Sequence, residues 1–227
     1  MALAQLKMDT TDARLADVVV PVGAAWSNDV RADALSRVRQ MGLPTKRDEY
    51  WKYTDPASLT AGGAPKASLF VNDEGPLFDA VDRVRIVFVD GVFDADASDD
   101  LIAEGVEITR LADAMQTDIH WVKDLYGVLE KRGQTPVERP LAALNTALAT
   151  DGIVIRVTGK AEKPINFIYL HKDETSDAVL HNVIKIEAGA EMTLLETGPA
   201  AARFSKTLEV DVADGGAFHH VRAQGRD

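Results

Sequence analysis

The chain has 227 residues and a formal net charge of −11 at neutral pH, with 46% hydrophobic and 27% charged residues and no cysteine. This composition is typical of a globular protein, and the length suffices for one large domain or two smaller ones. The negative charge argues against nucleic acid or anionic membrane as partners, because binding them depends on clustered lysine and arginine. The absence of cysteine excludes disulfide bonds, thiolate nucleophiles and thiolate-bound metal clusters within this chain.

The chain also has no obvious targeting segment. No apolar run approaches the roughly 20 residues that cross a bilayer, and the N-terminus lacks the basic and apolar stretches of a secretion signal. We therefore expect a cytoplasmic protein.

Residues 2–42 predict helices. Ser27 or Asn28 can cap a helix that the sequence Gly42-Leu43-Pro44 would end. Its apolar residues recur at a spacing near 3.6, at Val30, Ala34, Leu35, Val38 and Met41.

Residues 45–54 place three aromatic residues within four positions and surround them with charges, although aromatics form only 6% of the chain. Such rings either anchor a small domain on a larger one or form a binding surface. On a helix, Lys52 would lie close enough to Glu49 for an ion pair. The predicted interaction or docking residues are Arg47, Glu49, Trp51, Lys52 and Tyr53, with the alternative that Trp51 only docks the helical region onto the rest of the protein.

The middle of the chain predicts a loop, a strand and two helices. The glycines and proline of 61–65 indicate the loop, and the apolar run 85–91 indicates a buried strand that turns back through 92–93. Apolar stripes predict a helix over 111–132 and another that begins at Pro140 and ends at Asp151-Gly152.

After Gly152 the pattern changes to a repeat. Segments 153–161, 184–190 and 210–217 each alternate apolar residues and then reach a glycine turn, with Gly159, Gly189 and Gly216 spaced by 30 and 27 residues. A repeat of strands without helices predicts a β-solenoid, with a sandwich as the alternative. We expect an α+β fold, with a mainly helical domain over 1–150 that contains a short strand near 85–93, and the start of a β-helix core over 151–227.

The predicted solenoid has no closing cap, since the chain stops directly after a strand. An uncapped coil leaves backbone donors and acceptors exposed. We therefore expect these residues to be an N-terminal fragment of a longer protein, and expect the fragment to self-associate through its open end near Leu208 to Val221.

Four segments in order, 42–54, 140–156, 163–165 and 187–196, resemble the N-terminal half of the SufD branch of the SufB/SufD family of iron-sulfur cluster assembly proteins. The resemblance covers most of the chain. It implies a helical region that leads into a right-handed parallel β-helix, and a non-catalytic scaffold role in the SUF system. It also implies a SufB-like paralogue and a SufC-like ATPase as partners, bound through the C-terminal half of the family's longer members. The complex, rather than this chain, would handle the iron-sulfur cluster and ATP.

The candidate catalytic and metal-binding motifs are weak. His219 and His220 would point to opposite faces of a strand, and the acidic run 94–100 lacks the glycine and glutamate of a calcium loop. Thr158-Gly159-Lys160 carries only the end of a phosphate-binding loop, and no serine nucleophile motif is present. The sequence therefore predicts no enzyme and no catalytic, cofactor-binding or metal-binding residue. The alternative is a carbohydrate-active β-helix lyase or hydrolase, for which Glu187, Glu191 and Glu196 make a poor carboxylate set.

Overall fold

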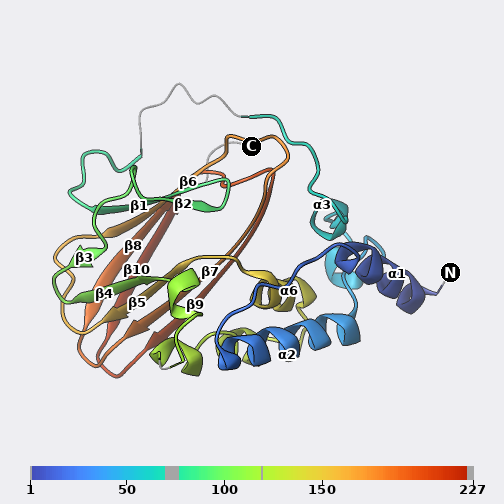
Figure 1. The fold of residues 1–227 in the computed structure, drawn as a ribbon, viewed down its shortest axis with the longest axis horizontal. Coiled ribbons are helices and arrows are strands. Elements are labelled where there is room, and N and C mark those ends of the chain that lie inside the picture. The colour runs from blue at the N-terminus through green and yellow to red at the C-terminus, as the bar shows by residue number, and fades with distance from the viewer. Residues whose placement is uncertain (1, 70–76, 119, 224–227) are drawn as a thin grey trace.

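The computed structural model describes residues 2–69, 77–118 and 120–223 (Figure 1). The fold is mixed α/β, with helices beside two five-stranded sheets. The helices are α1 Leu3–Leu15, α2 Ala25–Met41, α3 Ala57–Thr60, α4 Leu111–Ala114, α5 Val128–Arg132 and α6 Pro140–Leu148, with 3-10 helices η1 Glu49–Trp51 and η2 Trp121–Asp124. The strands are β1 Val84–Val89, β2 Val92–Asp94, β3 Ile102–Ala103, β4 Val106–Arg110, β5 Ile153–Val157, β6 Ile165–Leu170, β7 Asp177–Ile186, β8 Glu191–Thr197, β9 Arg203–Val212 and β10 Ala217–Ala223.

Successive strands from β5 to β10 alternate between the two sheets. Sheet A has the order β10-β8-β6-β1-β2, and sheet B has the order β3-β4-β5-β7-β9. In sheet B, Val154 pairs in parallel with Val183 and Val183 pairs with Glu209, which gives steps of 29 and 26 residues. Strands β6, β8 and β10 of sheet A repeat the same two steps. The chain therefore passes twice from one sheet to the other and back, with parallel pairing at each pass.

The glycine turns of the predicted repeat lie one above another. Glu191 N donates to Gly159 O at 3.1 Å, and Ala217 N donates to Ala190 O at 2.9 Å. Gly189 and Gly215 adopt positive φ values of 71° and 72°, which only glycine takes without strain. The sequence repeat is thus confirmed as a stack of turns between sheet B and sheet A, although the left-handed residue of the last turn is Gly215 rather than Gly216.

The main core lies between the sheets. Alternate residues of each strand point inward, because successive side chains of a strand face opposite sides. The buried inner residues include Ile86, Phe88, Ile155, Phe167, Leu180, Ile184 and Leu194. The chain at Gly152 passes close to β7, since a Cβ atom at Gly152 would lie 2.0 Å from the carbonyl oxygen of His181.

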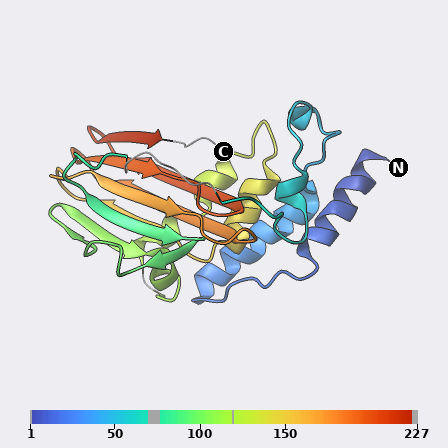
Figure 2. The ribbon, with the colours of Figure 1, turned by 90° about the horizontal axis from the view of Figure 1, so that it is seen from above.

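The helices cover the outer side of sheet B (Figures 1 and 2). Helix α2 packs along α6, and α6 contacts β7 and β9. Ala34, Val38, Ala143, Leu144 and Ala147 form the buried contact between the two helices. None of the helices in the described ranges is long and apolar enough to span a membrane.

Two local predictions differ from the structure. Helix α2 begins at Ala25 with Ala24 as N-cap, so neither Ser27 nor Asn28 caps it. Ser27 Oγ instead donates to the Met115 carbonyl at 3.1 Å, and the Asn28 amide bonds to Gly23. The described part of residues 111–132 forms the short helices α4, η2 and α5 rather than one helix, and Gly127, with a left-handed φ of 74°, separates η2 from α5.

Other local predictions are confirmed. Strands β1 and β2 pair antiparallel around Asp90-Gly91, and both turn residues have positive φ, as a tight two-residue hairpin requires. Helix α6 begins at Pro140 as expected and ends at Leu148, three residues before Asp151. Gly42 follows α2 with φ 68° and donates its N–H to Val38 O.

Candidate functional site

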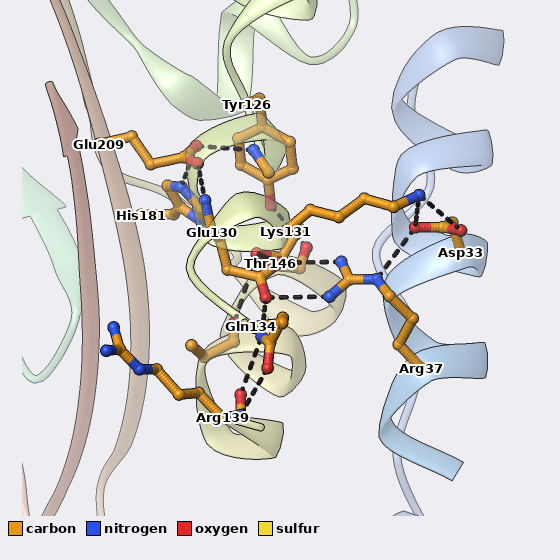
Figure 3. Close-up of polar contacts among 12 residues, drawn as sticks. Asp33, Arg37, Tyr126, Glu130, Lys131, Gln134, Arg139, Thr146, His181 and Glu209 are labelled. Carbon is orange, nitrogen blue, oxygen red and sulfur yellow. Dashed lines mark hydrogen bonds and ion pairs between the residues drawn. The ribbon is translucent and has the colours of Figure 1, made fainter. Parts of the chain in front are cut away.

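A buried polar network joins the helices to the outer side of sheet B, and we call it the Glu209–Glu130 network (Figure 3). Glu209 of β9 is 3% exposed and accepts three hydrogen bonds. Two come from the backbone N–H groups of Gly127 at 2.6 Å and Glu130 at 2.7 Å, and the third joins its Oε2 to His181 Nε2 of β7 at 2.9 Å. One strand carboxylate therefore fixes the start of α5 and a neighbouring strand together.

Glu130 continues the network toward α2 (Figure 3). Its two carboxylate oxygens accept from Arg37 Nη1 at 2.9 Å and Arg37 Nη2 at 2.8 Å. Thr146 Oγ1 of α6 donates to Glu130 at 3.1 Å, and Gln134 donates to the same carboxylate. The hydrogen bond to Glu130 raises the pKa of Arg37, so the guanidinium stays charged.

Tyr126 closes the network over His181. Its ring centroid lies 4.4 Å from that of His181, and its hydroxyl donates to the Thr146 carbonyl at 2.7 Å. Burial raises the pKa of Tyr126 well above its usual value, so the phenol remains a neutral donor. The acidic groups of this network are thus committed to internal donors, an arrangement suited to holding the helices in place rather than to proton transfer with a substrate.

A second polar cluster lies between the two sheets, around Glu196 of β8. Glu196 is fully buried and accepts from Tyr169 Oη at 3.1 Å, from His220 Nε2 at 2.9 Å and from Lys206 Nζ. Burial opposes the Glu196 charge, but Lys206 and His220 together outweigh it and lower the pKa of Glu196. Burial lowers the pKa of Lys206. The cluster links strands of both sheets across the interior.

The predicted docking residues lie between α2 and α3, near α1, where Lys7 of α1 pairs with Asp48 at 3.2 Å. Tyr53 is 92% exposed and Tyr50 is 73% exposed, whereas Trp51 is half-buried in η1. Trp51 borders a recess lined also by Lys7 and Pro140, so it faces α1 and the start of α6. Lys52 lies with Nζ 5.4 Å from the Tyr53 ring centroid, and the described residues show no ion pair between Lys52 and Glu49.

Arg47, Glu49, Lys52 and Tyr53 are all exposed. The structure thus brings the five predicted residues together in one short segment, and their role in binding a partner stays a prediction.

The weaker motifs have internal partners. Asp94 Oδ1 accepts from the N–H groups of Asp96 and Ala97, and Asp99 pairs with Arg85. His219 and His220 are adjacent on β10, and the ring of His220 bonds to Glu196 between the sheets, so the ring of His219 points to the opposite face. In the parts of the chain that the structure describes, no three histidine, aspartate or glutamate side chains are grouped to hold a metal ion.

The carboxylates considered for carbohydrate chemistry are each paired with a cation. Glu187 contacts Arg156 at 2.8 Å, Glu191 contacts Lys160 at 3.5 Å, and Glu196 contacts Lys206. No observation on the described residues favours the enzyme alternative.

The sequence did not point to the Glu209–Glu130 network. His181 stood alone in the sequence, and Glu130, Glu209 and Arg37 carried no motif. One signal could have found part of it, because the 26-residue step places Thr207 opposite His181 and Glu209 two residues further on the same face.

Comparison with protein families finds one match, over residues 78–167, to the model of the SufBD protein N-terminal region. The matched region runs from just before β1 into β6 and covers less than half of the chain. It supports assignment to the SufB/SufD family and hence to iron-sulfur cluster assembly, and it does not separate SufD from SufB. No match is found among curated proteins.

Proposed function

We propose that this protein is a non-catalytic, SufD-type scaffold subunit of a SUF iron-sulfur cluster assembly complex in the cytoplasm. The observation that carries the proposal is the match of residues 78–167 to the SufBD N-terminal region. The order of the segments 42–54, 140–156, 163–165 and 187–196 supports SufD rather than SufB. In this proposal the partners are a SufB-like paralogue and a SufC-like ATPase.

The alternation of β5 to β10 between two sheets supports the fold that this role requires. We infer that these strands are the first coils of a right-handed parallel β-helix, and that the mainly helical residues 1–150 lead into it and add strands β1 to β4 to the same two sheets. Paired strands are offset by 29 and then 26 residues in sheet B, and by the same two numbers in sheet A. Stacked coils produce such matching offsets. A rigid stack of this kind presents extended faces and edges to other subunits.

The composition favours a scaffold over a cluster-binding protein. Iron-sulfur clusters are usually held by cysteine thiolates, and this chain has no cysteine. We propose that the cluster is cargo of the complex, held by thiolates of another subunit, and that ATP is bound by the SufC-like partner.

Affinity capture after co-expression tests the proposal. The tagged protein is expressed with a SufC-like ATPase and either a SufB-like or a SufD-like partner, and bound proteins are quantified at mild salt. A SufD-type subunit retains the SufB-like partner and the ATPase and retains little of the SufD-like protein. Capture of neither partner, or preference for the SufD-like one, would overturn the assignment.

A matched variant separates specific binding from misfolding. Tyr53→Ala removes a 92% exposed side chain from the predicted docking segment, and Val19→Ala removes an 87% exposed side chain elsewhere. Both variants are expected to melt like the parent protein. Equal retention of partners by both would leave the docking segment without a role while leaving the family assignment intact.

A further inference from the structure

A cavity of about 280 Å³ lies between the helices and the outer side of sheet B. It is bordered by α1, α3 and α6 and by strands β7 and β9. Ligand pockets in proteins have volumes of about 300 Å³ and more, so this cavity is at the lower end of the range and suits a small molecule. Its apolar wall is formed by Leu59, Leu141, Leu144, Leu148 and Val179.

The polar end of the cavity holds two arginines and one carboxylate. Arg203 is 4% exposed and takes both oxygens of Asp177, with Nε 2.8 Å from Oδ1. Its Nη1 also donates to the carbonyls of Ala61 at 2.7 Å and Gly63 at 3.1 Å. The hydrogen-bonding capacity of Arg203 is therefore taken up by this loop and by Asp177.

Arg14 shares the same carboxylate but is poorly satisfied. Its side chain is 7% exposed, and its one hydrogen bond to the described residues runs from Nη2 to Asp177 Oδ2 at 3.4 Å. Its Nε is buried without a partner there. Nη1 makes no hydrogen bond to the described residues, and Arg14 is one of the residues that line the cavity.

The charge balance at this end of the cavity is positive. Arg14 and Arg203 are opposed by Asp177 alone, because Lys206 is paired with Glu196 on the inner side. Burial, and then the charge of Arg203, lowers the pKa of Arg14. A buried cation with unused donors is costly unless an anion offsets it.

We propose that this cavity binds a small amphipathic carboxylate, whose anionic group pairs with Arg14 and whose short hydrocarbon part lies against Leu141 and Leu144. A planar guanidinium and a carboxylate form two parallel hydrogen bonds. An inorganic anion would leave the leucine wall uncovered, and a neutral hydrocarbon would leave Arg14 unpaired. The inference concerns a different part of the molecule from the scaffold role and does not depend on it.

Octanoate is the probe that fits this description. A water molecule or a CH2 group occupies about 30 Å³, so the cavity has room for about nine such groups. Octanoate, with its eight carbon atoms and one carboxylate, is close to this size. Isothermal titration of the whole protein compares octanoate with octanol, which lacks the charge, and octylamine, which reverses it. We expect saturable one-to-one binding of octanoate, about tenfold weaker binding of octanol and no binding of octylamine.

Three variants test whether octanoate binds in this cavity. Arg14→Gln is expected to weaken octanoate binding about tenfold and leave octanol binding unchanged. Ala142→Phe, at a half-buried position on the cavity wall, fills the space and abolishes binding of both ligands. Arg39→Gln changes an exposed arginine away from the cavity and leaves both affinities unchanged.

Thermal melting checks that each variant is folded. If Arg14→Gln fails to fold, the Ala142→Phe result still decides the question. Absence of saturable octanoate binding to the parent protein would overturn the proposal. Octanoate binding that Ala142→Phe leaves intact, or that a folded Arg14→Gln leaves at full strength, would overturn it as well.

Discussion

His181 and Glu209 meet on the helix-facing side of sheet B, with the imidazole Nε2 2.9 Å from the carboxylate Oε2. Glu209 also holds the first turn of α5 through two backbone N–H groups. The pair therefore connects strands β7 and β9 to the helical layer, and its side chains are 0% and 2% exposed.

Glu209→Ala should destabilise the protein markedly. The change leaves the N–H groups of Gly127 and Glu130 and the His181 ring without their acceptor, and each unsatisfied buried group costs about 1–3 kcal/mol. Urea unfolding measures the loss. Asp211→Ala, two residues along the same strand, is the control and should change the unfolding free energy little. Equal stability of the two variants would contradict a structural role for Glu209.

Arg37→Met should cost about 3 kcal/mol, because it leaves the buried Glu130 carboxylate without its cation. Arg39→Met, on an exposed position of the same helix, should be nearly neutral. The double variant Arg37→Met/Glu130→Leu should recover part of the loss, since no unpaired charge remains. Strictly additive losses in this double-mutant cycle would mean that the two side chains do not interact.

The Glu196 cluster predicts a pH-dependent contribution to stability. The folded-state pKa of Glu196 is lowered, so its contribution is fully present above the unfolded value of about 4.3 and is lost as the pH falls through the folded value. Glu196→Gln should therefore be less stable than the parent at neutral pH and approach it in acid. Chemical unfolding over a series of pH values measures this difference. A difference that stays constant down to acid pH would exclude the ion pair as its source.

In the docking segment, we expect substitutions of exposed residues to weaken partner binding without lowering the stability of the protein. Tyr53→Ala should change the unfolding free energy by less than about 0.5 kcal/mol, because the ring is exposed. Trp51→Ala should destabilise, because Trp51 is half-buried against the recess beside α1. We expect substitution of Arg47, Glu49, Lys52 or Tyr53 to weaken partner capture without unfolding. If all four variants retain the partners, the segment does not take part in the interface.

We expect the protein to self-associate through the edge strands β9 and β10. Within the described part of the chain, β9 and β10 are the last strands of their sheets, and partly buried Phe204, Leu208, Val210 and Phe218 lie at that end of the core. Light scattering should show a mass that rises with concentration. Val221→Lys places a charge on the edge strand and should reduce association, whereas Val19→Lys should not. A monomer at high concentration would contradict this prediction.

The sequence predicted the parts of the fold that local patterns determine. Pro140 and Gly42 specify helix limits through backbone geometry alone. The glycine turns near Gly159 and Gly189 recur because strands that pair in parallel in both sheets turn at equivalent positions. The prediction of one helix over 111–132 was wrong, because an apolar stripe does not reveal that Gly127 takes a left-handed conformation.

The contacts that hold the layers together could not be predicted in the same way. Arg37 on α2 and Glu130 on α5 are 93 residues apart, and their helices meet because both pack against α6. Arg14 likewise meets Asp177 across 163 residues. Such pairs depend on tertiary arrangement, which charge and spacing in one sequence do not encode.

The scaffold role is tested most directly by native mass spectrometry of the complex captured from cells that express this protein with a SufB-like protein and a SufC-like ATPase. The account predicts a discrete assembly whose mass contains all three chains. A spectrum that shows this protein alone or only with copies of itself, while the other two chains form their own complex, would contradict it.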